Sequence, residues 1–209
     1  TNVDDVLANS EIAAVDVVTD PSSHHNVAVP ALEAGVHAIV EKPLGITIRA
    51  CQAIMDAAER GGVVLATAEN LRRDPPNRLV RGIIEEGLLG DPYYMVHNSL
   101  GGDDLFRITP WRHLKDKGAI GLDYAVHMAD IVQYYLGEFE EVYGRGMIVE
   151  PVRRRPDSED NTLESYQTRF KSYPESVEAT GEDSVIGMYR MSSGAMVAMA
   201  YISAGRGGT

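Results

Sequence analysis

Between residues 14 and 68 the sequence alternates short apolar runs with longer amphipathic segments, and this alternation constrains the fold most. The apolar runs are rich in β-branched residues and have the length of buried strands, at 14–19, 37–40 and 63–68. The first segment between them predicts a helix over residues 22–34 that ends at Gly35. The second predicts a helix with apolar side chains at helical spacing from Cys51 to Ala58. Strands and helices that alternate in this way are typical of a parallel α/β sheet.

From residue 91 the pattern changes and predicts a second domain of α+β class with a largely antiparallel open sheet. The expected elements are a strand over 93–100, a polar loop over 101–117, a strong helix over 119–136, a strand over 138–149, a loop or elaboration over 151–181, and a hairpin of strands over 183–191 and 195–203. The basic run from Arg153 to Arg155 is expected to be a solvated loop. We therefore predict two domains, 1–90 and 91–209.

Composition excludes several classes of function. The 209 residues carry a formal net charge of −12, which argues against nucleic-acid binding, since phosphate contacts depend on Lys and Arg. No apolar run approaches the length of about 18 residues that suggests a membrane helix, so no membrane partner is expected. One cysteine, Cys51, allows no disulfide within the chain, and no signal peptide is visible. A cytoplasmic protein is the prediction.

Unusual polar residues follow each of the three predicted parallel strands, in clusters at 19–25, 41–43 and 69–72. In a parallel α/β sheet the carboxyl ends of the strands form the ligand-binding edge. These clusters predict a cleft with Lys42 near its centre. Pro43 restricts Lys42 to an extended backbone, which fixes the lysine at the strand exit. A surface lysine paired with Glu41 explains the same pattern equally well, so both interpretations remain open.

The predicted helix over 119–136 places Asp123, His127 and Asp130 on one face, beside an apolar stripe of Leu122, Ala125, Val126 and Ala129 that should face the core. Gly118 and Gly121 permit a close backbone approach, which a ligand could use. The polar face has three interpretations: carboxylates that hold a structural histidine, a metal site, or acid–base chemistry with His127 as proton acceptor. Metal ranks lowest, because no second pair stands at ligand spacing; we expect no metal. On the pattern alone the structural interpretation is slightly ahead.

Longer motifs combine these residues. Residues 17–24 read VVTDPSSH and resemble a T-P-P-x-x-H turn, and residues 31–43 read ALEAGVHAIVEKP, close to an A-L-E-A-G-K-H-V-x-x-E-K-P signature. Further matches are an N-x-R-x-x-P segment at 70–75, a Trp-Arg pair at 111–112, and a G-G-x-x-x-D-x-x-x-H-x-x-D pattern at 118–130. Together they resemble the Gfo/Idh/MocA family of NAD(P)-dependent oxidoreductases, which includes inositol and sugar dehydrogenases. The resemblance spans nearly the whole chain and favours the catalytic interpretation.

The resemblance implies a partial Rossmann NAD(P)-binding domain over 1–90 and a partial substrate-binding and oligomerisation domain over 91–209. It implies an enzyme that transfers a hydride between a secondary alcohol of a sugar or polyol and NAD or NADP. It also implies a homodimer or homotetramer that uses the open sheet face. The implied catalytic residues are Lys42, Asp123 and His127, and the implied cofactor-binding residues are Thr19, Pro21, His24, Glu41, Lys42, Asn70, Trp111 and Arg112.

Within that resemblance, His127 is expected to act as general base, Asp123 to orient it, and Lys42 to stabilise the developing alkoxide. Two alternatives stay open: an NAD-dependent glycoside hydrolase or lyase that oxidises the sugar transiently, and a non-enzymatic cofactor-binding regulator.

The sequence departs from the family pattern at Asp20, Glu69 and Ala119, and has no G-x-G-x-x-G that opens a βαβ unit. We expect the unit with the glycine-rich loop to precede residue 1, and further strands to follow residue 209.

Overall fold

The computed structural model describes residues 2–157 and 164–205, and its contacts divide the chain into two compact units, Thr1–Glu69 and Asn70–Thr209. This division falls earlier than the predicted boundary at residue 90. The reason is that residues 70–90 make their contacts with the second unit. For example, Asn77 accepts a hydrogen bond from the hydroxyl of Tyr135 at 2.7 Å, and Arg81 donates to the carbonyl of Tyr134 at 2.6 Å. The domain boundary itself stays a prediction.

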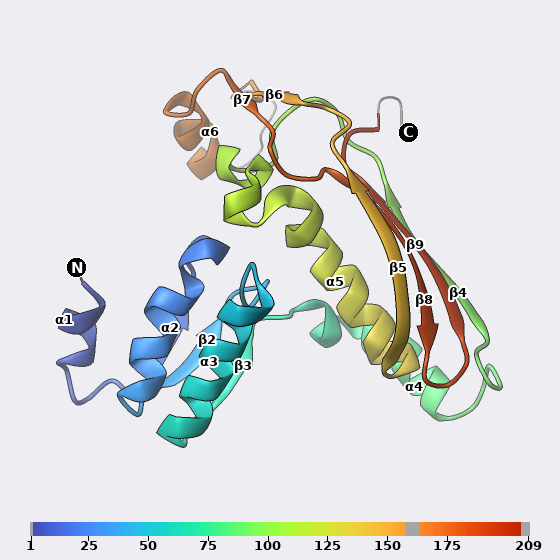
Figure 1. The fold of residues 1–209 in the computed structure, drawn as a ribbon, viewed down its shortest axis with the longest axis horizontal. Coiled ribbons are helices and arrows are strands. Elements are labelled where there is room, and N and C mark those ends of the chain that lie inside the picture. Colours follow the sequence, from blue (N-terminus) through green and yellow to red (C-terminus); the bar gives the residue numbers. More distant parts are fainter. Residues whose placement is uncertain (1, 158–163, 206–209) are drawn as a thin grey trace. The chain divides into compact units, whose positions relative to one another are not determined.

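The first unit is built on a parallel sheet of order β1-β2-β3, as the alternating pattern predicts (Figure 1). Its elements are α1 (Val3–Leu7), β1 (Ala14–Val17), the 3-10 turn η1 (Pro21–Ser23), α2 (His24–Glu33), β2 (His37–Val40), α3 (Ile48–Gly61) and β3 (Leu65–Thr67). Gly62, at φ 62°, ends α3 in the left-handed conformation that glycine adopts without strain.

One core holds the first unit together. Side chains of α2 and α3 pack against the sheet and against each other, with Leu32, Val40 and Ile54 fully buried. Because β1 and β2 are neighbouring parallel strands, both end at the same edge of the sheet, and the loops that follow them emerge side by side. This places the 19–25 and 41–43 clusters next to one another.

The second unit is an open mixed sheet of order β4-β9-β8-β5, with α5 across one face (Figure 1). Its elements are η2 (Leu71–Arg73), α4 (Pro75–Glu85), β4 (Tyr94–Leu100), η3 (Pro110–His113), η4 (Lys115–Lys117), α5 (Ala119–Leu136), β5 (Phe139–Met147), β6 (Val152–Arg154), α6 (Glu164–Lys171), β7 (Ser176–Glu178), β8 (Ser184–Met191) and β9 (Met196–Ile202). Two of the three strand pairs are antiparallel and β4 pairs with β9 in parallel, which confirms the predicted fold class.

The predicted helix over 119–136 is confirmed, but its predicted core face is wrong. The side chains of Ile120, Met128 and Val132 are buried against the sheet, whereas Leu122 is 39% exposed. Ala125 alone of the predicted stripe packs at the edge of this core. The helix is apolar almost all round, so its pattern could not select the face that the sheet covers.

The segment 151–181 contains regular structure where a loop or elaboration was expected, although residues 158–163 lie outside the described part. Within it, β6 and β7 form an antiparallel pair. The expectation of a solvated basic loop is wrong for Arg153, whose side chain is 0% exposed. Side chains alternate along β6, so Arg153 points inward while Val152 and Arg154 point outward.

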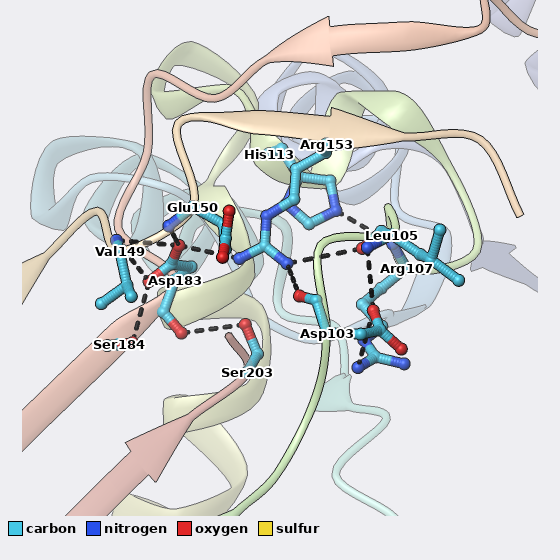
Figure 2. Close-up of polar contacts among 10 residues, drawn as sticks. All are labelled: Asp103, Leu105, Arg107, His113, Val149, Glu150, Arg153, Asp183, Ser184 and Ser203. Carbon is cyan, nitrogen blue, oxygen red and sulfur yellow. Dashed lines mark hydrogen bonds and ion pairs between the residues drawn. The ribbon is translucent and has the colours of Figure 1, made fainter. Parts of the chain in front are cut away.

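Arg153 lies at the centre of a buried polar cluster (Figure 2). It donates to Asp183 at 2.7 Å and to the carbonyl of Asp103 at 2.8 Å, and both members of the ion pair are 0% exposed. Burial raises the pKa of Asp183, but hydrogen bonds from the Glu150 amide, the Ser184 hydroxyl and other donors outweigh it, so the pKa lies below its usual value.

His113 packs beside Arg153 in the same cluster (Figure 2). Its Nε2 accepts a hydrogen bond from the Arg107 amide at 2.9 Å, which requires that nitrogen to be unprotonated. Burial, with nearby Arg153 and Arg107, lowers the pKa of His113 to about 3.

Among the described residues, no helix has the length and apolar character needed to cross a membrane.

Asp183→Ala should destabilise the protein by about 3–5 kcal/mol, because it leaves the Arg153 guanidinium buried without its partner charge. The free energy of unfolding in urea measures this loss. The matched control is Asp104→Ala, which removes the partner of Arg154 from an exposed ion pair and should change little. Equal losses of unfolding free energy from the two substitutions would contradict the stabilising role of the buried Arg153–Asp183 pair.

The folded-state pKa of His113 lies below its ordinary value of 6.5, so the unfolded state binds the extra proton between about pH 6.5 and about 3. The part of the unfolding free energy that depends on neutral His113 is fully present above pH 6.5. It is lost as the pH falls, at about 1.4 kcal/mol per pH unit. His113→Gln should remove this part of the slope. Unfolding free energies measured across that window test it, and an unchanged slope in the variant would count against it.

Candidate active site

The loop after β1 is organised by Asp20. Its carboxylate accepts hydrogen bonds from the hydroxyls of Ser22 and Ser23, the latter at 2.7 Å, and its carbonyl accepts from the Ser23 amide at 2.9 Å. These contacts build the turn η1 that leads into α2. Asp20 departs from the family motif, and the structure gives it a local role: it stabilises the turn that follows Thr19.

The loop after β2 carries Glu41, Lys42 and Pro43. The Glu41 amide still donates to the carbonyl of Val17 at 3.0 Å, which extends the pairing of β1 and β2 by one residue. The Lys42 amide donates to the Glu41 carboxylate at 3.1 Å. Both side chains are half-buried, and the Lys42–Pro43 peptide bond is cis. The lysine thus follows the carboxyl end of β2, the edge at which parallel α/β sheets commonly bind ligands.

His24 lies beneath these two loops with its side chain 0% exposed. Its Nδ1 is 3.0 Å from the carbonyl oxygen of Pro43, and its Nε2 is 3.2 Å from that of Thr19. The imidazole therefore bridges the loop after β1 and the loop after β2.

In the second unit, Asp123 and His127 lie one turn apart on α5, as their spacing predicts. Asp123 is 8% exposed and accepts a hydrogen bond from Nε of Arg112 at 3.0 Å. Arg112 also donates to the Thr109 hydroxyl at 2.9 Å, and its guanidinium stacks over the ring of Trp111 at 4.4 Å. The predicted Trp-Arg pair and the predicted aspartate are therefore parts of one cluster.

Asp130, on the same helix face, is held by a different arginine. Arg72 donates to it from Nε and Nη2, both at 2.6 Å, a bidentate ion pair that was not predicted from the sequence. Arg72 also lies over the ring of Tyr134. Asp130 thus ties η2 to α5, which supports a structural role for this carboxylate.

His127 is half-buried beside Tyr124. The ring of Tyr124 contacts it edge-to-face at 6.1 Å and stacks on Tyr201 at 4.5 Å. Burial raises the pKa of the Tyr201 phenol above its ordinary value. An imidazole, two phenols and a paired carboxylate gather at the first turns of α5. Groups of this kind can bind hydroxyls and move a proton.

The structure distributes the predicted residues over its two units. The first unit contains Thr19, Pro21, His24, Glu41 and Lys42. The second contains Asn70, Trp111, Arg112, Asp123 and His127. Thr19 and Asn70 are exposed, whereas Pro21 is buried. Within the described residues, no group of three or more His, Cys, Asp or Glu side chains could hold a metal ion.

Two family models match the chain. A model of the oxidoreductase family with an NAD-binding Rossmann fold matches residues 1–69, and the C-terminal domain model of the same family matches residues 77–208. The chain belongs to the Gfo/Idh/MocA family. The resemblance seen in its motifs is confirmed.

Curated and solved relatives agree with this assignment. Levoglucosan dehydrogenase from Pseudarthrobacter phenanthrenivorans is 34% identical over 142 residues, which are 66% of this chain and 36% of that enzyme. An oxidoreductase domain protein from Kribbella flavida superimposes with a TM-score of 0.82 at 26% identity, over 100% of this chain and 53% of that one. A levoglucosan dehydrogenase solved with NADH and L-sorbose gives a TM-score of 0.78 at 27% identity, over 99% and 52%. The chain thus spans about half the length of its solved relatives.

Gly121→Ala should destabilise the protein by about 1–3 kcal/mol, because the backbone that lies close to Gly121 belongs to this same chain and leaves no room for a side chain. A Cβ there would lie 2.7 Å from the carbonyl oxygen of Glu182, to which the Gly121 amide donates. Gly82→Ala is the matched control in a helix: a Cβ there meets nothing within 4 Å, so a gain of about 0.5–1 kcal/mol is expected. Chemical denaturation measures both, and the same sign for both would refute the packing explanation.

Proposed function

We propose that this chain carries the catalytic groups of a dehydrogenase that oxidises a secondary alcohol of a sugar or polyol with NAD or NADP. The observation that carries the proposal is the Glu41-Lys42-Pro43 loop, fixed at the ligand-binding edge of a sheet that matches an NAD-binding Rossmann model. The named similarity to levoglucosan dehydrogenase supports a carbohydrate substrate.

The proton step falls to α5. His127 would accept the proton of the substrate hydroxyl as the carbon loses its hydride and the C–O bond becomes a carbonyl. Asp123 would hold the orientation of His127 or a neighbouring hydroxyl of the substrate. Arg112 supports this role, because it neutralises Asp123 and fixes its position.

Lys42 would stabilise the negative charge that develops on the substrate oxygen before the proton has fully left. A lysine suits this role because its ammonium is a compact point charge. The hydrogen bond from its own amide to Glu41 supports a fixed starting position for the side chain.

The residues at the edge of the first sheet fit the nicotinamide half of a dinucleotide. Glu41 would accept hydrogen bonds from a ribose, and Thr19 and Pro21 would line the bound cofactor; Asn70, Trp111 and Arg112 are further proposed cofactor contacts. Bound NAD(P) would supply the hydride acceptor, which no side chain can provide.

We further infer a homodimer or homotetramer in the cytoplasm. The sheet face opposite α5 supports an oligomer, because apolar side chains on neighbouring strands stay exposed there. Val96 on β4, Met188 on β8 and Tyr143 on β5 are 52%, 53% and 70% exposed, and cross-strand pairing through Ala198 places them in one row.

The single cysteine is compatible with a reducing compartment.

Lys42→Ala and His127→Ala should each lower kcat by about 10²–10⁴-fold, since each removes a group that acts on the reacting oxygen. The assay follows NADH or NADPH formation in the complete protein against a sugar panel that includes levoglucosan and L-sorbose. Purified product should be the corresponding ketose or keto-sugar, formed in equal amount with the reduced cofactor.

Lys171→Ala is the matched control, since it removes an exposed lysine of α6, and it should leave kcat unchanged. Turnover of both Lys42→Ala and His127→Ala within a few-fold of wild type would overturn the mechanism. Sugar cleavage without net reduced cofactor would instead establish the hydrolase or lyase chemistry.

A further inference from the structure

The ring of His24 bridges the loops after β1 and β2 through contacts with two backbone carbonyls. A carbonyl oxygen only accepts hydrogen bonds, so each contact requires a proton on the ring nitrogen that faces it. A neutral ring donates to one of the two carbonyls and an imidazolium donates to both. In either form the ring spans Thr19 and Pro43, which lie 24 residues apart at the ends of adjacent strands.

The Pro43 contact lies one residue beyond Lys42. The regular pairing of the sheet stops at Glu41, whose amide makes the last ladder bond with Val17. Beyond it, side chains of α2 and α3 contact carbonyls of the loop. His24 holds Pro43, and the Cys51 thiol donates to Gly45 at 3.7 Å. His24 therefore contacts this loop one residue beyond Lys42, and it does so from another element, α2.

The same geometry separates His24 from a direct cofactor contact. The side chain is 0% exposed, and both ring nitrogens already face backbone oxygens. A group in this position can act on a ligand only through the loops that it holds.

We propose that His24 is a positioning residue for Lys42: by holding the Pro43 carbonyl against the first loop, it fixes the place from which the lysine reaches the substrate oxygen. This inference rests on the proposed function of Lys42. It replaces the sequence-based expectation that His24 lines the cofactor itself.

The test is a double-mutant cycle in the complete protein with His24→Phe and Lys42→Ala. His24→Phe keeps a flat ring but removes both ring nitrogens. It should lower kcat about 10–100-fold, the scale of a displacement of about 1 Å in a catalytic group, while KM for the cofactor changes little. In the Lys42→Ala background, His24→Phe should change kcat by no more than about twofold, because the group that it positions is gone.

His25→Phe makes the same substitution on the next residue of α2 and should leave kcat and KM at wild-type values. Amide hydrogen exchange in the chain gives a readout independent of activity. The peptide over 41–47 should exchange faster in His24→Phe than in wild type or His25→Phe. Should His24→Phe fail to fold, His24→Asn, which keeps one donor, provides the same comparison with a smaller loss.

The outcomes separate the two proposals. If Lys42→Ala retains wild-type turnover, the proposed function fails, and the exchange experiment alone still decides whether His24 orders the loop. If Lys42→Ala loses activity but His24→Phe does not, the positioning role is wrong and the function stands. Equal fold losses of kcat from His24→Phe with and without Lys42, or a rise in cofactor KM alone, would also overturn the positioning role.

Discussion

The second unit depends on one buried ion pair, Arg153 with Asp183. Buried charges are costly unless hydrogen bonds compensate them, and this pair is joined to backbone groups on two segments: Asp183 accepts from the Glu150 amide, and Arg153 donates to the carbonyl of Asp103. It fastens the β6 strand and the loop at 103–105 to the start of β8. The loop then continues into η3, where His113 and Arg112 lie next to each other in the sequence. The buried charge therefore fixes the segment that supplies the partner of Asp123.

Ion pairs with arginine also distinguish the two aspartates on the polar face of α5. Asp123 and Asp130 each bind an arginine from elsewhere in the chain, Arg112 and Arg72. The two aspartates look alike in the sequence, yet they differ in surroundings. The Asp123 pair lies beside Trp111 and Thr109 in a largely buried cluster, whereas the Asp130 pair anchors η2 to the helix. Spacing alone assigns both to one face, and only the partners separate a proposed chemical role from a structural one.

In the first unit, too, some features could be predicted from the sequence and others only the structure shows. The strand ends and the polar clusters that follow them were readable from the sequence, because β-branched runs and the Lys-Pro pair are local signals. The bridge made by His24 was not, since its two acceptors are backbone carbonyls that carry no sequence signature. The motif drew attention to His24 as a cofactor contact, and the geometry suggests a different way for it to act, through the two loops that its ring contacts.

The sequence by itself determined the parallel α/β character of the first unit, the extent of α5, the hairpin of the second sheet and the family, since these follow from local periodicity and contiguous motifs. Tertiary structure decided which face of α5 is buried, that Arg153 lies in the interior, and that Gly121 approaches the backbone of Glu182. The physical reason is the same in each case. An apolar helix surface, an arginine in a basic run and a glycine near a helix start each permit several environments, and the environment is chosen by residues distant in the chain.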